Sequence, residues 1–273
     1  MSNVSISTNK LTIGYRVQNT EYRVQTDLDF ALLQGEMVCM LGPNGCGKST
    51  LLRTLAGLQP ALAGAFSIQH SAFSPEKAVA LVLTERLSME NTTVHDVVAM
   101  GRYPYTSFLG GLTDEDETII AKSLQAVGFG NLTGEAGHTA KRSYSDSDLT
   151  AQRSVEAFAS TMFNAHSDGE KQRILIAKAL AQQTPIILLD EPTAHLDLPH
   201  RILVLRLLRQ LAHEQGKTVL ISTHELDLAL ALSDRILLMS PAGKGIQLDT
   251  PAALKQADAF TAAFGMDIFN PLG

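Results

Sequence analysis

A short glycine-rich stretch of this sequence has the composition and spacing needed to bind a triphosphate. It reads Gly42-Pro43-Asn44-Gly45-Cys46-Gly47-Lys48-Ser49-Thr50 and fits G-x-x-x-x-G-K-[ST], the pattern of a phosphate-binding loop (P-loop). Its glycines let the backbone turn tightly, so that successive N–H groups point at phosphate oxygens. Lys48 would reach the β- and γ-phosphates, and the hydroxyl of Ser49 would complete the coordination of Mg²⁺. The stretch predicts a nucleoside triphosphate site without telling what the energy is used for.

Two further groups of polar residues follow apolar runs, where a buried strand would end. Asp190 and Glu191 follow the run 186–189, and His224 follows the run 218–222. Asp190 would hold Mg²⁺ through its water shell, and Glu191 could polarise the water that attacks the γ-phosphate. An isolated Asp-Glu pair is as often a solvated loop, and an isolated loop histidine is more often structural. Their shared position after strands, downstream of a P-loop, favours the catalytic interpretation.

These residues need a parallel sheet to bring them together, and the hydrophobic pattern predicts one. Strands are expected at 4–13, at two short segments within 21–33, and at 37–41, 64–68, 78–83, 186–189, 218–222, 235–239 and 246–248. Helices are expected after the P-loop and at 93–100, 113–127, 155–163, 171–182, 198–215 and 226–232, with a helical tail from 251. Such alternation indicates an α/β fold with helices on both faces of the sheet. Ligands of such sheets bind at the carboxyl ends of the strands, where Gly42, Glu85, Asp190 and His224 would converge.

Composition narrows the classes of protein to which the chain could belong. The net charge of −6 over 273 residues argues against a nucleic-acid binder with a basic face. Two cysteines are too few for a disulfide framework, and the first ten residues have no apolar signal core. No run of 18 apolar residues occurs. We therefore expect a cytoplasmic chain, with a polar, Ser-rich surface insertion at about 131–165.

Taken in order, the motifs resemble those of the ATPase subunit of ABC transporters over nearly the whole chain. Tyr15 matches the aromatic residue that stacks on adenine, although such a tyrosine is more often an ordinary edge residue. Five further motifs follow in the order of the family: the P-loop, the signature motif at 167–170, the pair at 190–191, the D-loop at 194–197 and the switch histidine at 224. The segment 101–105, Gly-Arg-Tyr-Pro-Tyr, is similar to one in ATPases of iron-siderophore, haem and cobalamin importers.

The resemblance implies a P-loop NTPase (RecA-like) fold with a mostly parallel core, an antiparallel β subdomain and an inserted helical subdomain. The nucleotide-binding core would comprise 1–85 and 184–250, the helical subdomain 86–183, and the C-terminal tail 251–273. It also implies a head-to-tail homodimer that sandwiches two ATP molecules with Mg²⁺, in which Ser167 and Gly169 face the γ-phosphate bound by the partner subunit. Transmembrane permease subunits would bind the helical subdomains at the cytoplasmic side of the membrane, and a substrate-binding protein would act indirectly.

The sequence departs from the family pattern at two places. Thr84 and Glu85 stand where the family has a glutamine. Glu85 would then bind Mg²⁺ or position the attacking water. The usual signature Leu-Ser-Gly-Gly-Gln is replaced by His166-Ser167-Asp168-Gly169-Glu170. The carboxylates of Asp168 and Glu170 suit a helix N-terminus but would repel a triphosphate that they faced. We expect them to point aside, leaving Ser167 and Gly169 to bind.

Three other functions compete with that of an importer ATPase. A soluble ABC-type ATPase that is not coupled to a permease, acting on ribosomes or in repair, is disfavoured because the chain has no basic extension. A binding module that does not hydrolyse ATP is disfavoured by the presence of Lys48, Glu191 and His224. A P-loop kinase would leave the signature motif and the switch histidine without a role.

The substitution Glu85→Gln tests the first departure. We expect it to retain ATPase activity within roughly tenfold, because an oxygen ligand survives at this position. Steady-state phosphate release by the purified variant and the wild type measures this. A complete loss of activity would show that the carboxylate itself is required.

Overall fold

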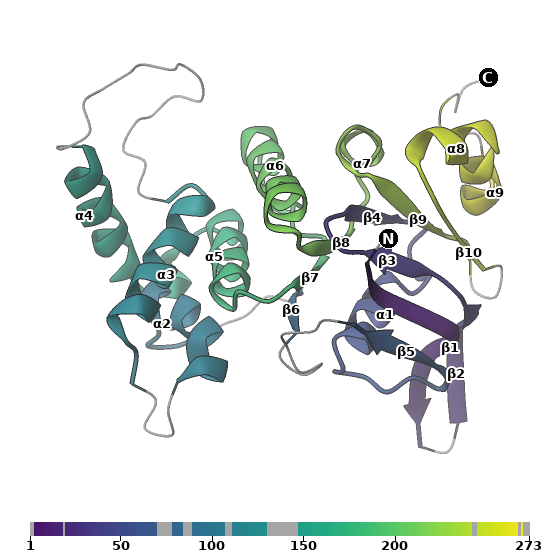
Figure 1. Ribbon diagram of the computed structural model, residues 1–273, viewed down its shortest axis with the longest axis horizontal. Coiled ribbons are helices and arrows are strands. Elements are labelled where there is room, and N and C mark those ends of the chain that lie inside the picture. Colours follow the sequence, from purple (N-terminus) through teal and green to yellow (C-terminus); the bar gives the residue numbers. More distant parts are fainter. Residues whose placement is uncertain are drawn as a thin grey trace. The chain divides into compact units, whose positions relative to one another are not determined.

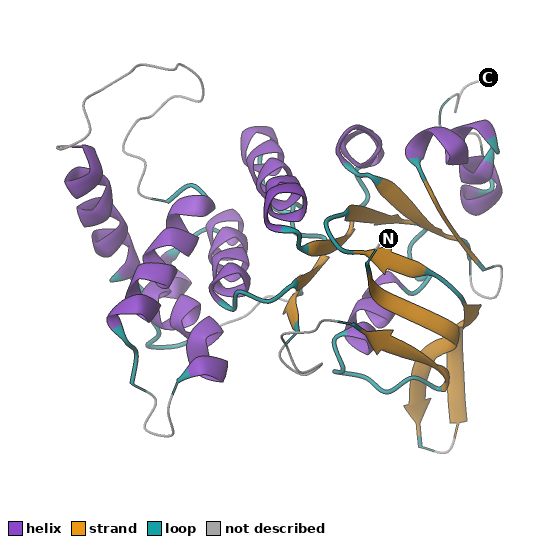
Figure 2. Ribbon diagram, in the orientation of Figure 1, coloured by secondary structure: helices purple, strands orange, loops and turns teal. Residues whose placement is uncertain are grey.

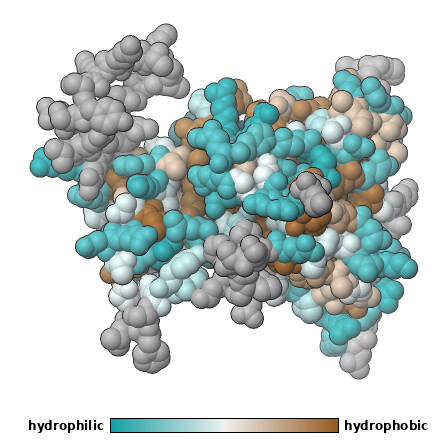
Figure 3. All heavy atoms as spheres, in the orientation of Figure 1, coloured by the Kyte–Doolittle hydropathy of each residue, from teal (hydrophilic) through white to brown (hydrophobic). Residues whose placement is uncertain are grey.

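The computed structural model describes residues 3–18, 20–69, 78–83, 89–106, 111–129, 147–241, 245–266 and 269, with side chains left out at 147–152. The chain divides into two compact units, which are described separately. Unit 1 comprises 1–83, 184–192 and 208–273, and unit 2 comprises 84–183 and 193–207. Figure 1 labels the elements and Figure 2 shows their type. Hydrophilic residues cover most of the described surface on the face seen in Figure 3.

Unit 1 is built on a six-stranded sheet in the order β10-β9-β4-β8-β7-β6. Its strands are β4 (Met37–Leu41), β6 (Val79–Val82), β7 (Ile186–Asp190), β8 (Thr218–Ser222), β9 (Arg235–Met239) and β10 (Ile246–Asp249). All neighbours are parallel except β10, which is antiparallel to β9. Every residue of β4, β7 and β8 is buried, as continuous apolar runs in a parallel sheet predict.

A second, antiparallel sheet of unit 1 contains β1 (Val4–Val17), β2 (Thr20–Leu28), β3 (Ala31–Leu33) and β5 (Ala63–Ile68). Helix α1 (Lys48–Leu55) contributes Leu51, Leu52 and Leu55 to an apolar core shared with residues of β1, β4, β7 and β8. The α/β prediction of a mostly parallel core with an antiparallel β part is confirmed.

The first strand is longer than the sequence predicts. We expected it to end at Gly14, but β1 continues to Val17. At Gly14 the strand runs so close to β2 that an added Cβ atom would lie 2.1 Å from the carbonyl oxygen of Tyr22. The glycine therefore permits close strand pairing here, and it is not a strand terminator.

The remaining helices of unit 1 follow the sheet strands. They are α7 (Leu226–Leu232), α8 (Pro251–Gln256) and α9 (Ala259–Phe264), and helix α6 (Leu198–Gln215) has residues in both units. The hydroxyl of Thr250 caps α8 by accepting from the N–H of Ala253, and Pro251 occupies the first helical turn, where proline is tolerated.

Unit 2 is helical in its described part. It contains α2 (Val94–Ala99), the 3₁₀ helix η2 (Met100–Tyr105), α3 (Asp114–Ala126), α4 (Ser147–Ala159), the 3₁₀ turn η3 (Phe163–Ala165) and α5 (Asp168–Ala181). Capping boxes at Thr93, Thr113 and Ser167 start α2, α3 and α5. The short helix expected at 155–163 is instead α4, which begins at Ser147, and residues 130–146 of the Ser-rich stretch lie outside the described residues.

A buried ion pair holds the segment 101–105 in place. The Nε atom of Arg102 lies 2.7 Å from Oδ1 of Asp116, and both side chains are about 7% exposed. The same guanidinium donates to the carbonyl of Ala181 and to Gln183, and it stacks on the ring of Tyr105 at 4.2 Å. The pKa of Asp116 is lowered to about 2. The largest cause is the hydrogen bond from the Thr113 backbone, and the second is the hydrogen bond from Arg102. The arginine of this motif is therefore structural within unit 2.

The substitution Asp116→Asn should lower the melting temperature at pH 7, because it removes the negative partner of a buried guanidinium. A depressed carboxyl pKa stabilises the fold above about pH 4, and the benefit is lost as the pH falls through about 2. The difference in melting temperature between variant and wild type should therefore narrow from pH 4 to pH 2. Thermal unfolding followed by circular dichroism measures it, with the exposed Glu115→Gln as the control. A difference that does not depend on pH would contradict this account.

Candidate functional site

The P-loop connects the end of β4 to the start of α1, both in unit 1. Helix α1 has no side-chain cap, so its first N–H groups are free to meet an anion. The Nζ atom of Lys48 is buried and donates to the carbonyl oxygens of Gly42 at 2.8 Å and Pro43 at 3.2 Å. At Gly42 a Cβ atom would lie 2.4 Å from the carbonyl of Met239, so only glycine fits. The loop is thus shaped to present backbone N–H groups and the Lys48 ammonium to an anion.

The carboxyl ends of β7 and β8 bring Asp190 and Ser222 side by side. These two residues are paired in the parallel register of the strands. The hydroxyl of Ser222 donates to Oδ1 of Asp190 at 2.5 Å and accepts from the N–H of Glu191 at 2.9 Å. The carbonyl of Ser222 accepts from the same N–H at 3.1 Å. One serine therefore positions both acidic residues.

Glu191 and His224 are in direct contact. Nε2 of His224 lies 2.5 Å from Oε1 of Glu191, and both side chains remain partly exposed. Glu191 has a φ of 45°, a left-handed conformation that is costly for a residue other than glycine. Its two N–H contacts with Ser222 hold it there. A carboxylate bonded to an imidazole, both open to solvent, is an arrangement that can accept and relay a proton.

His224 also lies near the P-loop. His224 and Gly42 line one cavity of about 180 Å³, together with Leu41, Thr223, Leu226 and Phe264. The groups at the ends of β4, β7 and β8 therefore meet at one edge of the sheet, where α/β proteins bind their ligands.

The signature residues lie in unit 2, at the start of α5. Ser167 is the N-cap, and its hydroxyl accepts from the N–H of Glu170. Gly169 lies against the carbonyl of His195, 3.0 Å from the position of an added Cβ atom. A cleft of about 600 Å³ opens here, lined by Ser167, Asp168, Gly169, Glu170, Arg173, His195, Leu196, Asp197 and His200. We expected Glu170 to point aside, but its carboxylate turns back onto Ser167, because the capping box draws it to the Ser167 N–H and hydroxyl.

The comparisons with known proteins decide the family. Residues 25–194 match the ABC transporter family. This chain belongs to that family. The iron(3+)-hydroxamate import ATP-binding protein of Bacillus subtilis is 34% identical over 263 residues, which cover 92% of this chain and 87% of that protein. The hemin import ATP-binding protein of Streptomyces coelicolor is 35% identical over 232 residues, covering 83% and 72%.

A solved structure of a metal-chelate type ABC transporter in an inward-facing conformation has the same fold. It aligns with a TM-score of 0.75 at 27% sequence identity, over 96% of this chain and 90% of that one. The chain is therefore an ATP-binding cassette and an ATPase of the ABC type.

Two residues of this ABC ATPase that the sequence did not single out support its site. The buried side chain of Gln25 donates to the carbonyl oxygens of Cys46 at 3.0 Å and Ser240 at 2.8 Å, so it braces the P-loop. Ser222 positions the acidic pair, as described above. Neither residue stands in a recognisable motif, and their roles depend on pairing between strands that are distant in sequence.

The other predicted residues are placed as follows. The exposed ring of Tyr15 on β1 stacks on Tyr22 of β2, with centroids 5.3 Å apart and an interplanar angle of 16°. Glu85 lies outside the described residues. Within the described chain, no group of three or more His, Cys, Asp or Glu side chains has a metal-binding arrangement. Nor does any described helix have the length and hydropathy to cross a bilayer.

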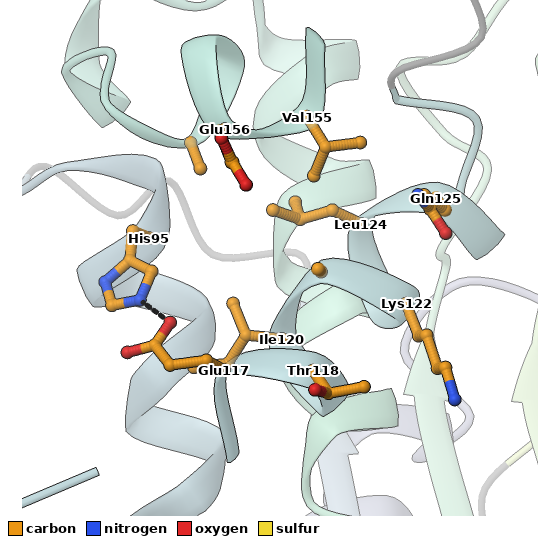
Figure 4. A pocket seen from close by; sticks show the side chains of 11 residues that line it. His95, Glu117, Thr118, Ile120, Lys122, Leu124, Gln125, Val155 and Glu156 are labelled. Atoms are coloured by element: carbon orange, nitrogen blue, oxygen red, sulfur yellow. Dashed lines mark hydrogen bonds and ion pairs between the residues drawn. The ribbon is translucent and has the colours of Figure 1, made fainter. Parts of the chain in front are cut away.

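A separate cavity of about 490 Å³ lies among α2, α3 and α4 of unit 2 (Figure 4). His95 bonds to Glu117 at 2.8 Å on one side of it, and Glu156 points into it from α4. Ile120, Leu124 and Val155 contribute to its apolar lining. None of its lining residues belongs to the signature cleft.

The substitution Ser222→Ala should reduce ATP turnover by roughly tenfold or more, because small misplacements of reacting groups are costly. It removes the hydroxyl that bonds to Asp190 and to the N–H of Glu191. Single-turnover hydrolysis measures the effect, and nucleotide binding by fluorescence checks that the P-loop is intact. Ser67→Ala, which removes an exposed hydroxyl of β5, is the control. Wild-type turnover in Ser222→Ala would show that the hydroxyl does not position the carboxylates.

Proposed function

We propose that this chain is the ATP-hydrolysing subunit of an ABC importer that energises uptake of an iron-siderophore or related chelate, such as haem or cobalamin, across the cytoplasmic membrane. The observation that carries the proposal is the contact between Glu191 and His224 at the sheet edge where His224 and Gly42 share a cavity. Such a pair beside a phosphate loop has the groups needed to activate water next to a γ-phosphate.

The residues of unit 1 would divide the chemistry among them. Residues 42–50 would bind the phosphates through backbone N–H groups and Lys48. Glu191 would orient the attacking water and take its proton, while His224 would hold that carboxylate and donate to the γ-phosphate. Stacking of adenine on the exposed ring of Tyr15 would fix the base.

Mg²⁺ fits the donors that the site offers. Ser49 supplies a hydroxyl and Asp190 a buried carboxylate, and both are hard oxygen ligands of the kind that Mg²⁺ prefers. Glu85 would add a third oxygen donor. The ion would neutralise charge on the phosphates when bound, and Ser222 keeps the carboxylate of Asp190 oriented for it.

The signature residues would complete the site of a second copy. Ser167 and Gly169 belong to a different unit from the P-loop, and they line a cleft at a helix N-terminus. A head-to-tail homodimer would place this N-terminus on the γ-phosphate of the partner subunit. Permease subunits would bind unit 2 at the cytoplasmic side of the membrane, and a substrate-binding protein would deliver the cargo to them.

The names of the relatives support the class of cargo. The two importer proteins compared above serve iron(3+)-hydroxamate and hemin, and the segment 101–105 matches the pattern of this group. The alternative is an ABC-type ATPase that is not coupled to a permease. Co-purification with a tagged permease partner, followed by ATP-dependent uptake of a radiolabelled iron chelate into proteoliposomes, separates the two. No permease complex and no uptake would favour the alternative.

The substitution Glu191→Gln should lower ATP turnover by roughly 100-fold or more, the contribution typical of general-base catalysis. The amide keeps its shape and its place beside His224, so ATP binding should persist and the variant should accumulate as an ATP-bound dimer. Phosphate release and size-exclusion chromatography with and without ATP measure the two effects. Lys48→Ala, which loses the phosphate-binding ammonium, is the control that should neither bind nor dimerise. Strong hydrolysis by a strictly monomeric preparation would contradict the dimer.

A further inference from the structure

His166, which stands just before the signature serine, has one ring nitrogen whose protonation the hydrogen bonds determine. Its Nε2 lies 2.7 Å from Oγ1 of Thr161. That hydroxyl already donates its one hydrogen to the carbonyl of Phe158, at 2.6 Å. Thr161 must therefore accept, and Nε2 of His166 must carry a hydrogen. The ring is further fixed by the side chain of Phe158 on α4, whose centroid lies 4.7 Å away.

The other ring nitrogen of His166 faces a carboxylate. Nδ1 lies 3.5 Å from Oε2 of Glu170, and the histidine side chain is only 12% exposed. In the neutral ring, Nδ1 is a lone pair directed at a negative oxygen, because the hydrogen sits on Nε2. In the protonated ring, the same contact becomes an ion pair. The charge state of His166 therefore decides whether this contact is repulsive or attractive.

The carboxylate oxygen that faces His166 is the same one that holds the signature serine. Oε2 of Glu170 accepts from the hydroxyl of Ser167 at 2.9 Å and from its N–H at 3.0 Å. Burial raises the pKa of Glu170, but the hydrogen bonds from Ser167 and the charge of His166 outweigh it, and the net pKa is lowered. Glu170 is thus ionised at neutral pH, and the one hydrogen of the serine hydroxyl is directed at it.

The cleft in front of Ser167 carries an excess of negative charge. Its ionisable lining comes from α5, from the segment that leads into α6 and from the first turn of α6. It consists of Asp168, Glu170, Arg173, His195, Asp197 and His200. When the histidines are neutral, the lining therefore has three negative carboxylates and one positive guanidinium. Like charges in a partly enclosed cleft oppose the entry of a phosphate group.

We propose that His166 and Glu170 form a proton-dependent gate on the signature serine. With His166 neutral, Glu170 retains the serine hydroxyl and repels a γ-phosphate. With His166 protonated, the imidazolium offsets that carboxylate and competes for its oxygen, which frees the hydroxyl to donate to the phosphate. Both are positioning residues that act through Ser167. The gate rests on the proposed function, in which this serine meets ATP bound by a second subunit.

The test compares ATP turnover of purified wild type, Glu170→Gln, His166→Gln and the double variant from pH 6 to pH 8. Expressing each turnover as a ratio to wild type at the same pH cancels the pH dependence of ATP and of the catalytic groups, which all four proteins share. Glutamine is the usual family residue at 170 and can still accept from Ser167, so the capping box should fold. Melting temperatures at each pH verify this, and Glu115→Gln controls for the loss of one negative charge elsewhere in unit 2.

If the gate operates, ATP turnover of Glu170→Gln should be about 1–2 times that of wild type at pH 6 and roughly 5–10 times that of wild type at pH 8. The rise is equivalent to about 1 kcal/mol of electrostatic repulsion removed from the transition state. His166→Gln should fall furthest below wild type at pH 6, where a protonated His166 opens the gate in the wild type. The double variant should match Glu170→Gln alone, because without the carboxylate the histidine has nothing to offset.

Two results would overturn the gate while leaving the ATPase assignment intact. One is a ratio for Glu170→Gln that does not change with pH, and the other is additive effects of the two substitutions. If wild type hydrolyses no more ATP than Lys48→Ala, the proposed function itself fails, and the gate fails with it.

Discussion

The parallel pairing of β7 with β8 is the constraint on which the rest of the nucleotide site depends. It places Asp190 opposite Ser222, and the serine then fixes both acidic residues through its hydroxyl and its carbonyl oxygen. The backbone of Glu191 is held in a left-handed conformation as a result. Because all residues of both strands are buried, a shift in register would disrupt the packing of the core as well as the geometry of the site.

The sequence is sufficient for the features whose chemistry is local. The P-loop, the buried strands and the acidic pair can be predicted because their patterns are contiguous: glycines at fixed spacing, or four to five apolar residues followed by a carboxylate. The capping box of α5 is also local, because Ser167 and Glu170 are three residues apart in the sequence. Its geometry alone requires Glu170 to fold back onto the serine, so the expectation that this side chain points aside was inconsistent with the cap itself.

The features that escaped prediction depend on contacts between distant segments. Gln25 joins residues 46 and 240, and Ser222 meets Asp190 from another strand. Neither partner is visible until strand order and register are known. The extension of β1 past Gly14 is of the same kind, because a glycine reads as a terminator until the neighbouring strand shows why a Cβ atom is excluded. In this chain, motifs identify the reacting groups, and long-range pairing supplies their supports.

The brace formed by Gln25 has a consequence for how the protein is made. Its side chain reaches a carbonyl at residue 240, 215 positions further along the chain, and it secures the P-loop only when β9 has docked beside β4. Contacts of such high sequence separation form late in folding, because the chain must lose the conformational entropy of the intervening loop before the contact can stabilise it. During synthesis, the N-terminal part leaves the ribosome with the whole phosphate-binding motif but without its brace. The nucleotide site is therefore complete only after residue 240 has been synthesised and β9 has docked.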